Sequence, residues 1–150
     1  MIKGLFESHL PVSNLEESIV FYEKLGLKLE SIIPNKVAFL WIVENKSWLG
    51  LWETDVTKYP YHPSIRHVAF EVSLENLKNS ILWLKERQIS TREAFGFEGK
   101  EPFVSPHKDK AYAKIHFYDL DKNSLEFITE LKNTEHAIEK MYLSDWLDNN

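Results

Sequence analysis

The 150-residue sequence contains no cysteine, only two methionines and five glycines, and no long hydrophobic segment. Without cysteine, the chain has no disulfides, no thiolate metal ligands and no cysteine nucleophile. No apolar run approaches the roughly 18 residues that a membrane-spanning helix needs, and the opening residues MIKGLFESHL lack a signal-peptide segment. We therefore expect a cytoplasmic protein with no membrane association.

An excess of basic residues is also lacking. The chain has 18 Lys and Arg against 23 Asp and Glu, its net charge is −5, and the basic residues are spread along the sequence. This distribution excludes nucleic acid as an expected partner. Hydrophobic residues make up 43% of the chain and aromatic residues 13%, enough for a packed core and for aromatic side chains lining a ligand site.

The most informative pattern is a repeat. The segment SHLPVSNLEESIVFYEKLGLKLE, residues 8–30, returns as RHVAFEVSLENLKNSILWLKERQIS, residues 66–90. Each copy has a histidine on an apolar strand-like run, then a serine, then an amphipathic helix, so His9 aligns with His67. We predict an α+β fold of two tandem βαβββ modules in a single domain. Their bounds are about 5–56 and about 65–131, and a C-terminal helix follows over about 133–147.

Local signals place most of the expected elements. Ser13 and Glu16 form a capping-box pattern before the first helix, and Ser73 is the expected cap of a second helix over about 74–87. We interpret the long polar segment 97–111 as a functional loop. Strands are expected over 5–12, 27–33, 36–43 and 47–53 in the first module, and over 65–72, 91–96, 112–118 and 124–130 in the second.

A third strand-like run, SLEFITEL, places Glu126 among apolar neighbours, where an unpaired carboxylate is costly to bury. The separation between His9 and His67 is 58 residues, and that between His67 and Glu126 is 59, as a duplicated module would give. Two imidazoles and one carboxylate suffice to bind a divalent metal with open positions, such as Mn, Ni, Zn or Fe(II). The alternative for each histidine is a core residue with a satisfied hydrogen bond.

The motifs HLPVSNLEESIVFYEKLGL and FYDLDKNSLEF resemble the opening and closing motifs of the vicinal oxygen chelate superfamily, the glyoxalase, bleomycin resistance and extradiol dioxygenase proteins. The resemblance covers residues 5 to about 130. It implies a cupped mixed sheet around a metal, with His9, His67 and Glu126 at the ligand positions. It also implies pairing of modules, often across a homodimer, and leaves open whether the ligands come from one chain or two.

The two halves differ at one expected ligand position. Aligning SWLGLWE with NSLEFIT sets Gly50 opposite Glu126, where glyoxalases of the lactoylglutathione type carry a fourth ligand, Glu or Gln. Strand alternation puts Trp48 and Trp52 on the face of Gly50 and Glu53 on the other face. We expect a three-ligand site with a substrate pocket that includes Trp48, Gly50 and Trp52. Glu53 fits a solvated strand-end carboxylate better than a fourth ligand.

His116 is the candidate general acid or base, because its side chain faces the cup if Ile115 and Phe117 face the helices. The alternative is a surface or dimer-contact histidine. Tyr112 and Lys114 on the same strand are further candidates for the substrate pocket. Fosfomycin-modifying members have small hydroxyl or tyrosine side chains in this strand and an arginine in the tail, whereas this chain has Lys114 and His116 and no such arginine.

These observations favour a glyoxalase-like, divalent-metal-dependent enzyme acting on a small oxygen-chelating molecule. Its reaction would be of lyase, isomerase, transferase or dioxygenase type. One alternative is a metal-free drug- or metabolite-binding protein of the bleomycin resistance type. Another is an interaction module that regulates a second protein through the terminal helix.

Overall fold

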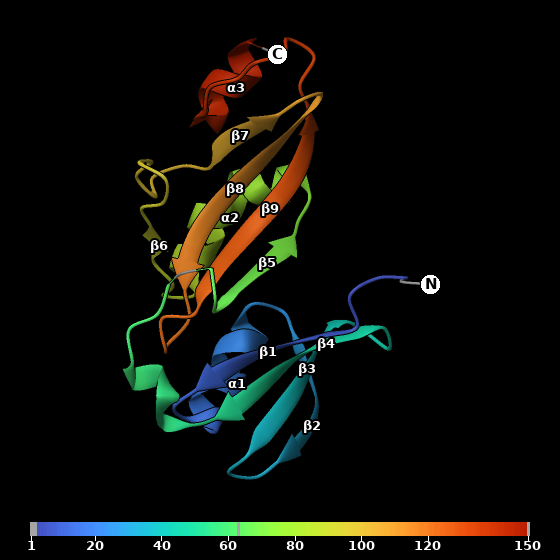
Figure 1. The fold of residues 1–150 in the computed structure, drawn as a ribbon, viewed down its shortest axis with the longest axis vertical. Coiled ribbons are helices and arrows are strands. Elements are labelled where there is room, and N and C mark those ends of the chain that lie inside the picture. Colours follow the sequence, from blue (N-terminus) through green and yellow to red (C-terminus); the bar gives the residue numbers. More distant parts are fainter. Residues whose placement is uncertain (1–2, 63, 150) are drawn as a thin grey trace. The chain divides into compact units, whose positions relative to one another are not determined.

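The computed structural model describes residues 3–62 and 64–149, and its contacts divide the chain into two compact units (Figure 1). Unit 1 takes in the chain up to His67 together with Asp119–Ser124, and unit 2 takes in Val68–Tyr118 and the chain from Leu125 onward. The fold is mixed α+β with two sheets and a C-terminal helix, as predicted. That the two modules form one domain stays a prediction. Within the described residues, no helix has both the length and the apolar character to cross a membrane.

Unit 1 contains the βαβββ order expected of the first module. Its sheet has the order β1-β4-β3-β2, in which β1 runs parallel to β4 and the other pairs are antiparallel. The elements are β1 (Glu7–Val12), α1 (Leu15–Lys24), β2 (Lys28–Ile33), β3 (Val37–Val43), β4 (Ser47–Glu53) and the short 3-10 helix η1 (Asp55–Lys58).

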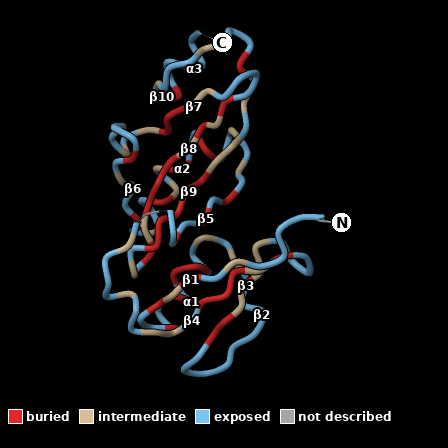
Figure 2. Tube along the Cα trace, viewed as in Figure 1, coloured by how far each residue is buried: buried red, intermediate tan, exposed pale blue. Residues whose placement is uncertain are grey.

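Strand alternation divides the two faces of the unit 1 sheet. Leu10 and Val12 of β1, and Leu49 and Leu51 of β4, are at most 2% exposed, and α1 packs on the sheet with Tyr22 fully buried. Buried residues therefore run along β4 (red in Figure 2). The side chains between them point the other way, onto what we call the open face of unit 1. It carries Glu7, His9, Trp48, Gly50 and Trp52.

The cap of α1 differs from the prediction by one residue. Asn14, and not Ser13, is the N-cap, because its Oδ1 accepts from the backbone N–H of Glu17 at 3.0 Å. The backbone N–H of Ser13 instead donates to the carboxylate of Asp121 at 3.0 Å, which holds Ser13 outside the helix. The predicted cap of the second helix is confirmed, since Ser73 accepts from the backbone N–H of Asn76.

Unit 2 contains a sheet of order β10-β7-β8-β9-β5, with β6 paired to β8. Its elements are β5 (His67–Glu71), α2 (Leu74–Glu86), β6 (Thr91–Arg92), β7 (Phe103–His107), β8 (Lys110–Tyr118), β9 (Ser124–Lys132), β10 (Met141–Tyr142) and α3 (Leu143–Asn149).

The prediction of a loop over 97–111 is wrong for seven of its residues, of which five form β7 and two, Lys110 and Ala111, begin β8. Phe103 and Val104 are buried, and β7 pairs antiparallel with β8. The turn between β7 and β8 contains no glycine. Lys108 takes the left-handed conformation there, with φ 57°. The sequence therefore lacked the usual hairpin signal.

The strand predicted over 91–96 is cut to two residues, β6. Ala94 and Phe97 exchange backbone hydrogen bonds in a tight turn, with Phe95 at φ 55° and Gly96 at φ 82°. Positive φ at both central residues is the geometry of a hairpin turn and ends the strand.

The C-terminal helix is also shorter than predicted, since α3 starts at Leu143 and not near residue 133. The buried side chain of Asn133 donates to the carbonyls of Lys108 and Ala137 and accepts from the N–H of Ala137, which folds this segment into a loop. Side-chain bonds of this kind compete with helix formation. Trp146, 2% exposed, packs α3 into unit 2.

The core of unit 2 lies between its sheet and α2. Ile115 and Phe117 of β8 are almost fully buried, and the Phe127 ring of β9 contacts both Phe117 and Trp83 of α2. Alternation therefore turns His116 to the opposite face. We call this the polar face of unit 2, and it carries Arg92, Phe103, Tyr112, Lys114, His116 and Glu126.

Candidate functional site

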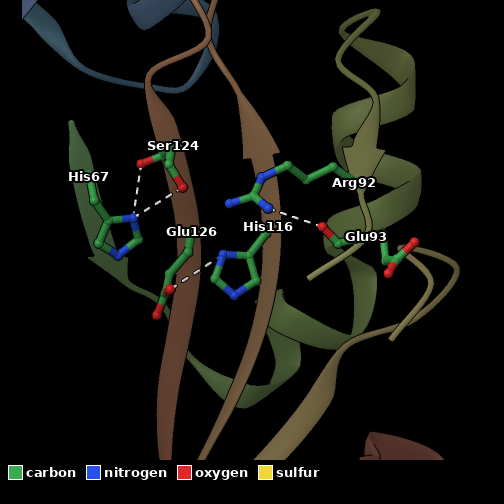
Figure 3. Close-up of polar contacts among 6 residues, drawn as sticks. All are labelled: His67, Arg92, Glu93, His116, Ser124 and Glu126. Carbon is green, nitrogen blue, oxygen red and sulfur yellow. Dashed lines mark hydrogen bonds and ion pairs between the residues drawn. The ribbon is translucent and has the colours of Figure 1, made fainter. Parts of the chain in front are cut away.

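A buried imidazole and a buried carboxylate meet on the polar face of unit 2. His116 Nδ1 lies 3.5 Å from Glu126 Oε2, and the two side chains are only 3% and 7% exposed (Figure 3). The Phe103 ring stacks on His116 with a centroid distance of 5.8 Å. Burying either group is costly unless the two offset each other's charge. This face therefore holds a candidate acid–base pair shielded from water.

Phe95 lies beside this pair in a strained conformation. Its φ of 55° is unusual for a bulky residue, its side chain is 65% exposed, and its ring centroid is 5.7 Å from that of His116. Lys140 Nζ and Lys114 Nζ lie 4.7 Å and 5.8 Å from the Phe95 ring centroid. Strain of this kind gathers at functional sites. Two ammonium groups and an exposed ring thus border the buried pair.

Two further side chains share the polar face. Arg92 of β6 is in register with His116, its guanidinium lies 4.6 Å from the Tyr118 ring centroid, and its Nη1 donates to the carbonyl of Glu93 (Figure 3). Tyr112 lies on the same face of β8 as Lys114. The role of Tyr112 and Lys114 in a substrate pocket and that of His116 as general acid or base stay predictions.

His67, the first residue of β5, has the tautomer of a metal-binding histidine. Its Nδ1 lies 3.0 Å from the carbonyl oxygen of Ser124 and 3.3 Å from the Ser124 hydroxyl (Figure 3). A carbonyl only accepts hydrogen bonds, so Nδ1 carries the proton and the neutral ring has its lone pair on Nε2. A bond of this kind orients histidines that bind metal.

His9 is held differently, on the open face of unit 1. The Trp52 indole Nε1–H donates to His9 Nδ1 at 2.9 Å, and His9 Nε2 lies 3.5 Å from Glu7 Oε1. An indole N–H only donates, so in neutral His9 the lone pair is on Nδ1 and the proton is on Nε2. His9 therefore has the chemistry of a metal ligand, with its lone pair directed at Trp52.

Gly50 makes room for this ring. A Cβ added at Gly50 would lie 2.2 Å from His9 Nδ1, and the two residues are partners in the parallel β1–β4 pair. The His9 imidazole therefore occupies the space beside Gly50, the position where the sequence predicts that a fourth ligand is missing. Trp48 and Trp52 lie on the same face as Gly50, as strand alternation predicts.

Glu53 does not contribute to the open face. Its Oε2 accepts from the backbone N–H of Leu15 at 2.9 Å, so its carboxylate caps the N-terminus of α1. A negative charge at that end is stabilised by the helix dipole. Glu53 is thus a helix cap, where the sequence suggested a solvated carboxylate.

Sequence reasoning missed a buried network in the closing motif. The Asp119 carboxylate accepts from the Tyr22 hydroxyl at 2.7 Å, from Asn123 Nδ2 at 2.6 Å, and from the backbone N–H groups of Asp121 and Asn123. Burial raises the pKa values of both Asp119 and Tyr22. Arg66 Nε donates to Asn123 Oδ1 at 2.6 Å. The network therefore anchors the residue before His67, and the Asp-to-Asn spacing of the turn was its available signal.

Comparison with known proteins identifies the family of the chain. No family model matches the sequence. A metallothiol transferase FosB from Staphylococcus epidermidis is 30% identical over 120 residues, which cover 79% of this chain and 75% of that protein. The chain belongs to the vicinal oxygen chelate superfamily.

Solved structures show the same fold. The integron cassette protein HFX_CASS4 from the mobile metagenome of Halifax Harbour sewage outfall has a TM-score of 0.64 and 25% identity, and the comparison covers 85% of this chain and 99% of that one. The fosfomycin resistance protein FosX from Listeria monocytogenes, complexed with Mn(II) and sulfate, has a TM-score of 0.60 and 20% identity. That comparison covers 99% of this chain and 98% of FosX.

The ligand triad expected of a vicinal oxygen chelate protein stays a prediction. Over residues 3–62 and 64–149, no three or more His, Asp or Glu side chains form a group that could hold a metal ion. His9 belongs to unit 1 and Glu126 to unit 2, while His67 is the last residue of unit 1 and the first of β5, the strand beside β9 in the sheet of unit 2. Taken one at a time, the donors fit a divalent ion, because His67 has its lone pair on Nε2 and Gly50 accommodates the His9 ring.

Proposed function

We propose that the chain is a divalent-metal-dependent enzyme that acts on a small, negatively charged, oxygen-chelating molecule. His9, His67 and Glu126 are the proposed metal ligands. The proposal is supported by the likeness to metallothiol transferases and by the Mn(II) complex of FosX. A cytoplasmic location and a homodimer, which the sequence predicts, belong to the same proposal.

The observation that carries this proposal is the buried His116–Glu126 pair, bordered by a strained aromatic residue and two lysines. In a protein with a purely structural sheet, apolar residues would fill this face more stably than a buried imidazole and carboxylate. Titratable groups kept in such an environment are typical of sites that move protons.

Each part of the proposed site has its own role in the reaction. A bound divalent ion would polarise neighbouring oxygens of the substrate. Lys114 and Lys140 are placed to bind an anionic group, and the exposed Phe95 ring, which lies near both ammonium groups, to pack against its carbon skeleton. His116 is the proposed proton carrier, because its ring lies beside a carboxylate and near the Phe95 ring.

Among the possible reactions, group transfer to an electrophilic substrate is the one that the relatives favour. In such a step a thiol sulfur forms a bond to carbon, a carbon–oxygen bond of the substrate breaks, and the thiol proton ends on the released oxygen. The tail of this chain has Lys140 and not the arginine expected of fosfomycin-modifying members, so its anion contacts differ from theirs. Mn(II) is the proposed metal, ahead of Ni, Zn or Fe(II), since FosX binds it.

The metal content of protein purified without chelators or metal-affinity steps tests the proposal. We expect one divalent ion per native chain and its loss in Glu126→Ala. Glu130→Ala, which removes an exposed carboxylate four residues further along the same face of β9, should keep the ion. A native chain that holds no metal and is not stabilised by added Mn2+ would contradict the proposed function.

A metal-free binding protein of the bleomycin resistance type is the second candidate. It is favoured by the aromatic open face of unit 1, where the Phe39 and Trp41 rings lie 5.7 and 5.1 Å from Trp48 and Trp52 is 40% exposed. Aromatic surfaces bind flat hydrophobic ligands without a metal. Ligand capture by the metal-free chain that persists in Glu126→Ala would favour this function.

A further inference from the structure

Glu7 is a carboxylate without an assigned role. It is the first residue of β1 and lies two positions before His9, so both side chains project from the same face of the strand. Its register partner on β4 is Trp48, and the register partner of His9 is Gly50. A charged residue at this place, beside Trp48 on the open face of unit 1, is unexpected for a surface that serves only packing.

Contacts hold the Glu7 carboxylate in one orientation. The Trp48 indole Nε1–H donates to Glu7 Oε2 at 2.8 Å, and Oε1 is turned toward His9 Nε2. Support of this kind, from a donor on a neighbouring strand, is what orients carboxylates that bind metals.

The distance between Glu7 and His9 suits a shared ion better than a hydrogen bond. Glu7 Oε1 and His9 Nε2 are 3.5 Å apart, whereas a hydrogen bond between such atoms is about 2.7–3.2 Å long. Two neighbouring ligand atoms that each lie about 2.1 Å from one ion are about 3.0 Å apart at the right angle of octahedral coordination and about 3.4 Å apart at a tetrahedral angle. The carboxylate oxygen thus already lies where a second ligand beside His9 belongs.

We infer that Glu7 is a fourth protein ligand of the metal, acting beside His9 and taking the role that a side chain at position 50 cannot fill. This inference rests on the proposed function. Gly50 is closed to any side chain because the His9 ring occupies the space of its Cβ. The Glu7 carboxylate on β1 would supply the missing ligand oxygen at the Nε2 side of the His9 ring, whereas Gly50 lies at the Nδ1 side.

Trp52 competes with this arrangement. Its indole N–H donates to Nδ1, which keeps the proton of neutral His9 on Nε2, the atom that faces Glu7. An ion at Nε2 would require that single ring proton to move to Nδ1, which could then no longer accept from the indole N–H, so the indole would turn away. Since Trp52 is 40% exposed, the turn meets little resistance. Trp52→Phe should therefore bind Mn2+ about 2- to 10-fold more tightly, as expected from loss of one opposing hydrogen bond.

Titration calorimetry with Mn2+ alone tests the inference on the full chain. Glu7→Gln keeps an oxygen that can accept from Trp48 but removes the charge, and it should weaken Mn2+ binding at least about 10-fold. The absorption spectrum of the Co2+-loaded protein should change as well, because the ligand set changes. Glu23→Gln, which alters an exposed carboxylate on α1, is the matched control and should change neither property.

The outcomes separate this inference from the proposed function. A native chain that binds no Mn2+ would overturn the proposed function and the inference together. Native binding that Glu7→Gln leaves equally tight would overturn the inference alone. Weaker binding with an unchanged Co2+ spectrum would also overturn it, since Glu7 would then only position His9.

Discussion

At the scale of single residues, Gly50 permits the His9 ring to lie against β4, because any Cβ there would lie 2.2 Å from His9 Nδ1. We expect Gly50→Ala to lower the free energy of unfolding by about 1–3 kcal/mol, as overpacking does. Denaturant unfolding measures the change. The same substitution in a His9→Ala background should have little effect, since the clashing ring is gone. An equal loss in both backgrounds would show that the clash is not its cause.

Tyr22 makes the second prediction at this scale. Its hydroxyl donates to the buried Asp119 carboxylate at 2.7 Å. Removal of a donor from a buried charged acceptor costs about 1.5–3 kcal/mol, so Tyr22→Phe should lose that much stability in denaturant unfolding. Tyr59→Phe is the control, because Tyr59 is 68% exposed and should lose almost nothing. Equal stability of the two variants would contradict the role of the network.

The same residue predicts a pH dependence. Burial and the Asp119 charge raise the pKa of Tyr22 well above its ordinary value of 10.0. The folded chain therefore holds the phenol proton more tightly than the unfolded chain, and this contribution is full below that ordinary value and lost as pH rises above it. Tyrosinate absorbance should show Tyr22 ionising only as the protein unfolds in alkali. Tyr22→Phe should lack that late component, and its stability should fall less steeply with pH.

At the scale of elements, Glu53 ties the end of β4 to the start of α1 through its bond to the Leu15 N–H. Glu53→Ala should destabilise the fold by about 0.5–2 kcal/mol, as loss of a helix cap does. Metal affinity should be unchanged, which calorimetry with Mn2+ measures. Glu23→Ala in the last turn of α1 should leave both quantities nearly unchanged. A loss of metal affinity in Glu53→Ala would instead make this carboxylate a ligand.

Periodic signals explain which elements the sequence predicted. The strands of unit 1 and the second helix lie close to the ranges that the sequence predicted, and the first helix follows its predicted capping box. β7 was not predicted because Lys108 takes the left-handed conformation in the turn that follows it, and no sequence pattern indicates this conformation for a lysine. The helix predicted from 133 fails at Asn133, whose side chain bonds the backbone of a loop. Such side-chain contacts depend on tertiary structure.

Some features of the candidate site were predicted from the sequence and others were not, for the same reason. Strand alternation correctly put Trp48, Gly50 and Trp52 on one face, because a period of two needs no partner. The contact of Trp52 with His9 depends on the register of the parallel β1–β4 pair, which the sequence does not specify. The same register places Glu7 opposite Trp48. Because the sequence does not specify this register, it did not predict the carboxylate beside His9.

At the scale of the whole molecule, exposed apolar side chains favour association with a second copy. Phe6 is 62% exposed and Trp52 40% exposed in unit 1, and Phe95 is 65% exposed in unit 2. Exposed aromatic surface of this kind marks interaction sites. We expect a homodimer by light scattering, in which His9 of one chain acts with His67 and Glu126 of the other.

Mixing two inactive variants tests that arrangement. His9→Ala and Glu126→Ala should each bind no metal alone. After both are unfolded together and refolded, random pairing makes half of the dimers mixed, and each mixed dimer has one complete ligand set. The mixture should thus recover about a quarter of the native metal content per chain. No recovery, although mixed dimers form, would place all three ligands in one chain, and a monomeric native protein would contradict the homodimer itself.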